Sequence, residues 1–119
     1  MSYIKKRKSA FGFAFKGIFL FFKEEAHAKI HLIIFLIVLF AGIYFELSGV
    51  EWVIILIASA LVFSTEMLNS ALERTIDYLH PEQHESIGKA KDIAAGAVLI
   101  AAIFAVAIGV VVFWPYLRT

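Results

Sequence analysis

Residues 93 to 114 read IAAGAVLIAAIFAVAIGVVVFW and contain no charged side chain. A helix needs roughly 20 apolar residues to cross a hydrocarbon core about 30 Å thick, and this run supplies them without interruption. Two further apolar runs precede it, at about 32–45 and 52–72. The first of them reaches the required length if its helix extends back through Lys29, whose aliphatic stem can place the ammonium group at the interface. The sequence therefore predicts three membrane-spanning helices.

The composition excludes the main alternatives to a membrane protein. Of the 119 residues, 61% are hydrophobic and 18% are charged, whereas a soluble domain is about half apolar and about a quarter charged. Disorder requires low hydrophobicity and high net charge. The net charge of +1 does not indicate a nucleic-acid partner, and the absence of Cys excludes disulfides and thiol chemistry. We therefore expect a small all-α integral membrane protein that forms one domain over residues 1–119.

The expected elements follow from the apolar runs and the segments between them. We expect spanning helices at 24–46, 51–79 and 91–115, with a loop at 80–90. Within residues 1–23, apolar side chains line one helical face at Ile4, Phe11, Phe15, Ile18 and Phe22. Lysines lie largely elsewhere around that helix, which is typical of an amphipathic helix in the membrane interface. A frayed basic tail is the alternative.

The distribution of basic residues predicts the orientation in the membrane. Basic side chains precede the first span and also occur in the connection from Glu73 to Asp92. They are Lys5, Lys6, Arg7 and Lys8 before the first span, and Arg74, Lys89 and Lys91 in that connection. The connection at 46–51 carries no Lys or Arg. Because cytoplasmic loops are enriched in Lys and Arg, the N-terminus and the loop at 80–90 are predicted to face the cytoplasm.

Small residues form a second pattern in the last span. They recur at steps of three and four, at Ala94, Ala97, Ala101, Ala105 and Gly109. In lipid, such a stripe lets helix backbones approach closely. The partner helix can belong to the same chain or to another copy, and because three helices make a thin bundle, we favour an oligomer.

Polar side chains in the second span carry the main indication of function. Glu66, Asn69, Glu73 and Asp77 fall on one stripe that climbs about 16 Å along the helix at 100° per residue. A solvated charged face does not explain Glu66 and Asn69, because apolar residues precede them. Ionisable groups within a span cost a few kcal/mol and indicate function. We therefore interpret Glu66 and Glu73 as functional residues.

Charged groups near the cytoplasmic ends of the spans suit a magnesium-bridged polyphosphate. Glu25, Lys91 and Asp92 are expected at the depth of the acidic stripe. Mg²⁺ prefers carboxylate, phosphate and water oxygens. A lysine can neutralise a transferring phosphoryl group, and another carboxylate can accept a proton. Composition alone does not distinguish this site from ion binding. A small proton-coupled transporter is one alternative, although its carboxylate should lie near the midplane of the membrane, and a non-enzymatic scaffold is another.

These motifs together resemble the prokaryotic diacylglycerol kinase and undecaprenol kinase family. The resemblance rests on Glu66-x-x-Asn69-Ser70-x-x-Glu73-x-x-x-Asp77, His84 and Lys91-Asp92-x-x-x-x-Ala97-Val98-Leu99, and on Phe15-Lys16-Gly17 and Glu25-x-x-x-Lys29-x-His31. It implies a homotrimer in the bacterial inner (cytoplasmic) membrane, with three spanning helices and an interfacial helix per subunit. It also implies ATP- and Mg²⁺-dependent phosphorylation of a membrane lipid alcohol at sites shared between neighbouring subunits.

The resemblance implies a role for each matching residue. Glu66 would be the general base for the lipid hydroxyl, and Asn69 would help to orient the carboxylate cluster. Glu25 and Glu73 would hold Mg²⁺ and so contact ATP, and Lys91 would contact the phosphates. The remaining nucleotide contacts would come from Lys16, Asp77, Glu82, His84 and Asp92.

The lipid acceptor is expected to be undecaprenol or diacylglycerol. The triplet Lys29-Ile30-His31 resembles the undecaprenol kinase branch more closely, whereas His27 stands where that branch usually has Asn. His27 and His31 are expected to line the lipid site with Glu66, and a transition-metal ligand pair is the alternative. Because these side chains offer few partners for a glycerol ester, we favour undecaprenol.

Overall fold

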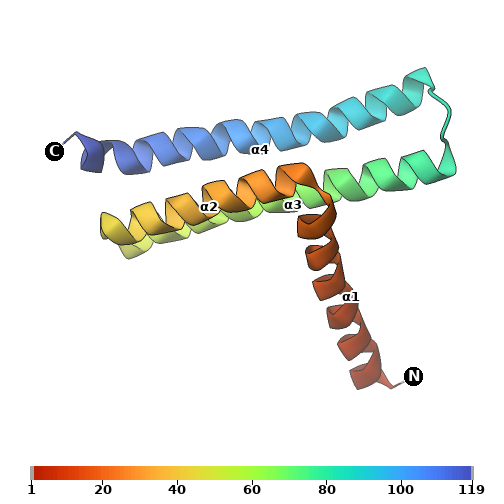
Figure 1. Ribbon diagram of the computed structural model, residues 1–119, viewed down its shortest axis with the longest axis horizontal. Helices are drawn as coiled ribbons and strands as arrows, with labels where there is room; N and C mark the ends of the chain where they lie inside the picture. The colour runs from red at the N-terminus through yellow and green to blue at the C-terminus, as the bar shows by residue number, and fades with distance from the viewer. Residues whose placement is uncertain (1, 119) are drawn as a thin grey trace. The chain divides into compact units, whose positions relative to one another are not determined.

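The computed structural model describes residues 2–118 and contains four helices over that range. They are α1 (Tyr3–Glu24), α2 (Ala26–Tyr44), α3 (Gly49–Leu79) and α4 (Glu85–Leu117), labelled in Figure 1. No strand occurs among the described residues, so the predicted all-α fold is confirmed. The chain forms two compact units, one ending at Ile34 and the other beginning at Phe35, so that α2 contributes to both.

Three of the helices are long and apolar enough to cross a membrane. They are α2 with 19 residues, α3 with 31 and α4 with 33, and their number agrees with the three predicted spans. At 1.5 Å per residue, α3 and α4 are about 46 and 50 Å long, more than the thickness of a hydrocarbon core of about 30 Å. Part of each helix therefore extends beyond the hydrocarbon, and the polar ends next to residues 80–84 suit that position.

In the N-terminal unit, α1 is a helix that begins at a side-chain cap. The Ser2 hydroxyl accepts a hydrogen bond of 3.3 Å from the Lys5 backbone N–H, which satisfies one free N–H group of the first turn. Arg7 Nε donates to the Tyr3 hydroxyl at 3.0 Å. The helix ends at Glu24, and the next residue has an extended backbone. A helix is thus observed over nearly the predicted range, while its position in the membrane interface stays a prediction.

The connection between α2 and α3 is a tight reversal. The Leu47 N–H donates to the carbonyl of Gly42, as in the Schellman motif that ends many helices. Glu46 has a φ of 54°, in the left-handed region that usually favours glycine. The reversal brings α3 back along the later part of α2, where the rings of Phe35 and Phe63 meet edge to face with centroids 5.6 Å apart.

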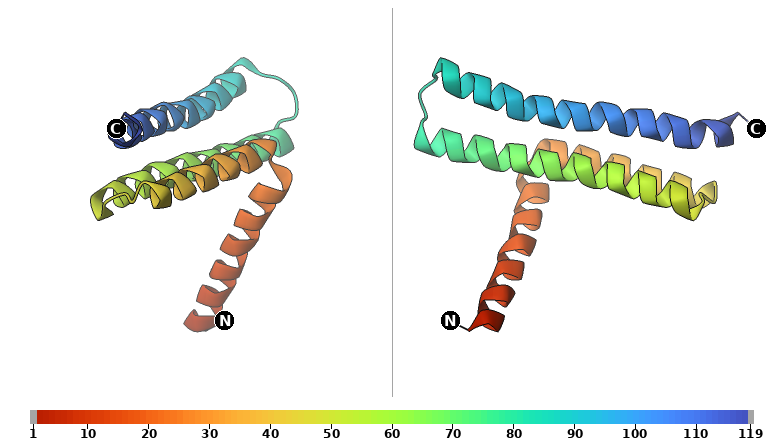
Figure 2. Two further views of the ribbon diagram at one scale, coloured as in Figure 1. Left: turned by 60° about the vertical axis from the view of Figure 1, so that its left-hand side comes forward. Right: turned by 180° about the vertical axis from the view of Figure 1, so that it is seen from behind.

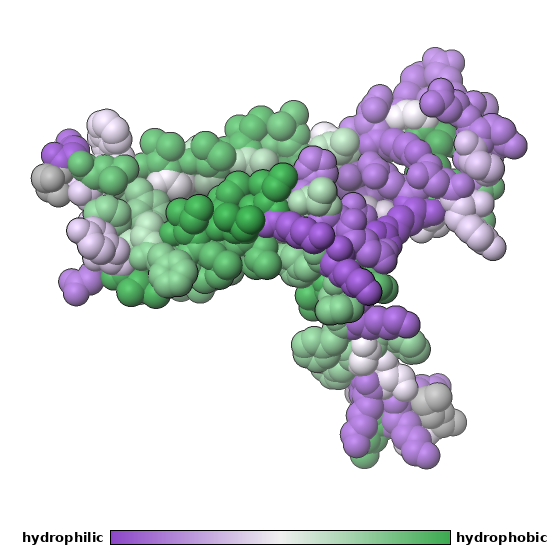
Figure 3. Space-filling view, in the orientation of Figure 1, coloured by the Kyte–Doolittle hydropathy of each residue, from purple (hydrophilic) through white to green (hydrophobic). Residues whose placement is uncertain are grey.

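In the second unit, α3 and α4 lie side by side (Figures 1 and 2). Ser48 and Glu51 form a reciprocal capping box at the start of α3. The same Glu51 carboxylate accepts a hydrogen bond of 2.5 Å from the Tyr116 hydroxyl near the end of α4. The apolar core lies beside this contact and comprises Leu47, Ile55 and Val112, with Val38, Trp52, Ile108, Phe113 and Tyr116 packed against them. Hydrophilic residues gather at the other end, around the α3–α4 connection (Figure 3).

The start of α4 differs from the sequence-based expectation. The predicted loop covers 80–90, but the helix already begins at Glu85, which leaves 80–84 as the connection. The early start has a local cause, because His84 Nδ1 accepts a hydrogen bond of 3.1 Å from the Ser86 backbone N–H and so caps the helix. Histidine is not among the preferred N-cap residues, so this start signal is easily missed.

The small-residue stripe lies partly on the less exposed face of α4. Buried and half-buried positions recur there every three or four residues, and they include Ala94, Ala101, Ala105 and Val112. Ala97 is exposed. Because α4 packs along α3, the stripe contributes at least in part to packing within the chain.

We expect Gly42→Ala to destabilise the reversal between α2 and α3. A Cβ at this position would lie 2.5 Å from Cη2 of Trp52 and 3.1 Å from Cδ1 of Leu47, so the rigid indole would have to move. Overpacking of this kind costs about 1–3 kcal/mol, of which the better helix propensity of Ala offsets up to about 1 kcal/mol. Thermal unfolding in detergent should show a lower Tm. Gly96→Ala is the matched control, because a Cβ there meets open space, and an equal Tm loss in both variants would contradict the steric explanation.

Candidate active site at the α3–α4 connection

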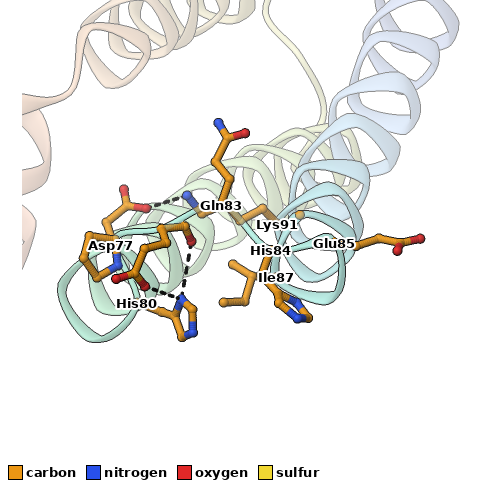
Figure 4. Close-up of a pocket in the computed structure, with 10 residues that line it drawn as sticks. Asp77, His80, Gln83, His84, Glu85, Ile87 and Lys91 are labelled. Atoms are coloured by element: carbon orange, nitrogen blue, oxygen red, sulfur yellow. Dashed lines mark hydrogen bonds and ion pairs between the residues drawn. The ribbon is translucent and has the colours of Figure 1, made fainter.

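A cavity of about 430 Å³ lies where α3 ends and α4 begins. It is lined by Asp77, His80, Pro81, Glu82, Gln83, His84, Glu85, Ile87, Gly88 and Lys91. Carboxylate groups and an ammonium group are among these side chains, and Figure 4 shows them around the connection. Four residues that the sequence predicts as nucleotide contacts are therefore brought together, namely Asp77, Glu82, His84 and Lys91.

An ion pair joins the two helices at this cavity. Lys91 Nζ on α4 lies 2.5 Å from Asp77 Oδ1 on α3 (Figure 4). The Lys91 side chain is 34% exposed and that of Asp77 is 63% exposed, so the lysine is the more enclosed partner. The pair holds a positive charge at a fixed place on the cavity wall, where an anionic group of a ligand can meet it.

The connection itself is organised by two histidines. His80 Nδ1 lies 3.3 Å from the Glu82 carboxylate and 3.3 Å from the Glu82 carbonyl oxygen. His84 caps α4, and the two imidazole rings lie 6.2 Å apart. Sequence reasoning missed His80, although its spacing of four residues from His84 across Pro81 is a visible signal. These contacts hold the Glu82 side chain next to the cavity.

The acidic stripe of α3 runs from the buried part of the helix toward this cavity. Glu66 is buried, with 9% exposure, while Glu73 and Asp77 are exposed. Asn69 Nδ2 lies 3.4 Å from Glu73 Oε1, a weak hydrogen bond that orients both side chains. The predicted stripe therefore exists, and it connects a sheltered carboxylate to exposed ones within one helix.

The donor set of α3 fits part of a magnesium site. Asn69 Oδ1 is buried and has no hydrogen-bond partner within residues 2–118, so a hard oxygen ligand is left over beside the Glu73 carboxylate. No group of three or more His, Asp or Glu side chains in this range converges as a complete metal site. Mg²⁺ commonly uses one or two carboxylates and takes its remaining ligands from phosphate and water. The side chains present therefore suit a metal that arrives with a phosphorylated substrate.

The other predicted site residues lie outside the cavity. Asp92 follows Lys91 on α4 and is exposed. Lys16 is an exposed residue of α1, and Glu25 lies at the break between α1 and α2. The first turns of α2 carry His27, which is exposed, and His31, which is half-buried. Because these last four residues belong to the N-terminal unit, their contribution to the site stays a prediction.

Fold and site together define a small helical membrane protein with a polar, charged cavity at one end of its apolar helices. Comparison with known proteins identifies the family. The chain belongs to the prokaryotic diacylglycerol kinase family, whose model matches residues 12–113. The resemblance seen in the sequence is thereby confirmed, and the protein belongs with the transmembrane lipid kinases, for which ATP is the implied phosphate donor.

Individual relatives cover most of the chain. The undecaprenol kinase of Bacillus subtilis (strain 168) is 37% identical over 108 residues, which are 91% of this chain and 88% of that protein. The diacylglycerol kinase of Escherichia coli (strain K12) is 31% identical over 107 residues, or 90% of this chain and 88% of that protein. The diacylglycerol kinase of a Synechocystis strain is 35% identical over 101 residues, covering 84% of this chain and 58% of its own length.

Proposed function

We propose that this protein is an ATP- and Mg²⁺-dependent kinase that phosphorylates the hydroxyl group of a membrane lipid alcohol, with undecaprenol favoured over diacylglycerol. The observation that carries the proposal is the charged cavity at the end of two long apolar helices. The Lys91 ammonium lies on the cavity wall, which supports a contact with ATP phosphates, and the stripe on α3 leads from there to the buried Glu66. The stripe thus links a polar cavity that suits a water-soluble donor with a sheltered carboxylate that suits a lipid acceptor.

The proposed reaction assigns each step to a residue of this chain. The lipid hydroxyl oxygen attacks the γ-phosphorus of ATP while the bond from that phosphorus to the bridging oxygen breaks and ADP leaves. Glu66 accepts the hydroxyl proton. Lys91 holds the phosphate oxygens, and Glu82 and His84 hold the nucleotide at the cavity wall, with Lys16 and Asp92 as further contacts. Glu25 and Glu73 would hold Mg²⁺, which supplies charge neutralisation on the phosphates when bound.

The proposed assembly is a homotrimer whose sites are shared between subunits. Large apolar side chains such as Phe104, Val106 and Val111 are exposed on α4, and they suit lipid or a neighbouring subunit. We further propose the bacterial inner membrane as the location, with the N-terminus and the cavity on the cytoplasmic side, where ATP is available.

The acceptor is the finer part of the proposal. One relative is named undecaprenol kinase and others are named diacylglycerol kinase. The triplet Lys29-Ile30-His31 is similar to the undecaprenol kinase branch, and the polar side chains at the start of α2, His27 and His31, offer little recognition of a glycerol ester. These features favour a long polyprenol with a small headgroup.

A competition assay tests the acceptor. The purified protein in vesicles that contain undecaprenol and diacylglycerol at equal surface concentration should convert more undecaprenol, measured with labelled ATP and separation of the two products. A clear excess of phosphatidic acid would reverse the order of acceptors. The absence of label in either lipid, with a folded protein, would reject the lipid kinase function altogether.

A further inference from the structure

The contact between Lys91 and Asp77 joins residues that are 14 positions apart and come from different helices. It therefore fixes where the Lys91 ammonium lies relative to the end of α3. The Lys91 ammonium sits on a flexible four-carbon stem. Holding such a side chain in one place costs conformational entropy on the order of 2 kcal/mol. A lysine that already has an anchor loses less entropy when a phosphate binds.

The ammonium group keeps binding capacity while it is anchored. It carries three N–H donors and no acceptor, and Asp77 takes one of them through Oδ1. Two donors remain for phosphate oxygens. The anchor and the phosphate therefore do not compete for the same proton, and both can be bound at once.

The charge of Asp77 argues against direct contact between its carboxylate and a polyphosphate. An unpaired carboxylate on the cavity wall would repel phosphate oxygens, whereas in the ion pair the Lys91 ammonium offsets the charge of Asp77. We infer that Asp77 is a positioning residue that holds the Lys91 ammonium for the phosphates, and that it is not itself a nucleotide contact. This inference rests on the proposed function, in which the cavity accepts the ATP phosphates.

The test compares two probes. Inorganic tripolyphosphate has the phosphate chain of ATP but neither base nor ribose, so it reports on phosphate contacts alone. Purified full-length protein in lipid, with excess Mg²⁺, is assayed for the KM of ATP. Tripolyphosphate binding is measured separately, from protection of the protein against thermal unfolding at increasing tripolyphosphate concentration, which requires no activity. Asp77→Asn should raise the KM of ATP and weaken tripolyphosphate binding by a similar factor, roughly three- to fivefold, because both depend on the anchored ammonium of a partly exposed ion pair. Asp77→Glu should recover most of the lost affinity for ATP and tripolyphosphate, since it retains a carboxylate.

A double-mutant cycle identifies the residue through which Asp77 acts. If Asp77 acts through Lys91, Asp77→Asn should have almost no further effect on tripolyphosphate binding in a Lys91→Ala background. Lys89→Ala is the matched control for loss of a nearby positive charge, because Lys89 is exposed and pairs with Glu85 one turn away. This variant should leave the KM of ATP and the affinity for tripolyphosphate within twofold of the wild-type values.

Two results would overturn the inference. In the first, Asp77→Asn raises the KM of ATP but leaves tripolyphosphate binding unchanged, which would make Asp77 a contact of the base or ribose. The other is an undiminished effect of Asp77→Asn in the Lys91→Ala background. The lipid assay separates this inference from the proposed function. A folded protein that phosphorylates no lipid would reject the function, and tripolyphosphate binding in that protein that still depends on Asp77 and Lys91 would support the pair.

Discussion

Glu73→Gln is expected to reduce phosphoryl transfer by at least about 10²-fold while the protein stays folded. The amide has the size of the carboxylate and can still meet Asn69 Nδ2, which lies 3.4 Å from Glu73 Oε1. What is lost is the negative charge, and hard cations such as Mg²⁺ depend on carboxylate oxygens. Neutralisation of the phosphates by a bound metal contributes several kcal/mol in reactions of this kind, and each 1.36 kcal/mol corresponds to about tenfold in rate.

The measurement is the rate of lipid phosphorylation with labelled ATP over a range of Mg²⁺ concentrations. A lost metal ligand should raise the Mg²⁺ concentration needed for half-maximal rate, and a purely structural defect would not. Glu46→Gln is the control, because it removes an exposed carboxylate at the α2–α3 connection, next to the apolar core. A near-normal rate and an unchanged Mg²⁺ dependence in Glu73→Gln would reject Glu73 as a metal ligand.

The existence and number of the spanning helices could be predicted from the sequence because hydrocarbon thickness sets a length requirement. The uninterrupted run from Ile93 to Trp114 meets it without reference to anything else in the chain. The boundaries are harder, since they depend on individual hydrogen bonds. The His84 cap moves the start of α4 to Glu85, and Glu46 adopts a left-handed backbone that composition does not indicate.

The acidic stripe could be predicted because helical periodicity fixes which side chains of one helix share a face. Asn69 and Glu73 are four residues apart and do make contact. The Lys91–Asp77 ion pair is different, since it depends on how two helices pack and on the length of the turn between them. A predicted loop of 80–90 would leave Lys91 at a helix start, whereas the observed turn at 80–84 places it well inside α4, on the wall of the cavity.

The roles of site residues in the N-terminal half could not be predicted from the pattern of this one sequence. The roles of Glu25, His27 and His31 come from the family resemblance, because no periodicity links them to α3. The oligomeric state likewise could not be predicted from the small-residue stripe. Small side chains permit close packing with any helix, and in this chain Ala94, Ala101 and Ala105 are half-buried in α4, which packs along α3. The stripe therefore does not require a second copy of the chain.

Glu66→Gln is expected to lower the rate of lipid phosphorylation by about 10²- to 10⁴-fold, the range associated with loss of a general acid or base. Glu66 is 9% exposed in a helix that can cross the membrane, whereas the cavity residues lie farther along α3 and on α4. The substitution retains the size and polarity of the side chain but removes its ability to accept the hydroxyl proton. ATP binding should therefore be largely unchanged.

Two measurements on the same preparation separate these effects. The turnover rate is measured with labelled ATP and saturating lipid alcohol, and ATP affinity is measured from protection of the protein against thermal unfolding at increasing nucleotide concentration. A general base predicts a large loss of rate with unchanged protection. Glu66→Asp should recover part of the rate, because it restores a carboxylate on a shorter side chain. A loss of rate and of ATP protection in equal proportion would place Glu66 in nucleotide binding, and a rate close to that of the wild type would show that another group accepts the proton.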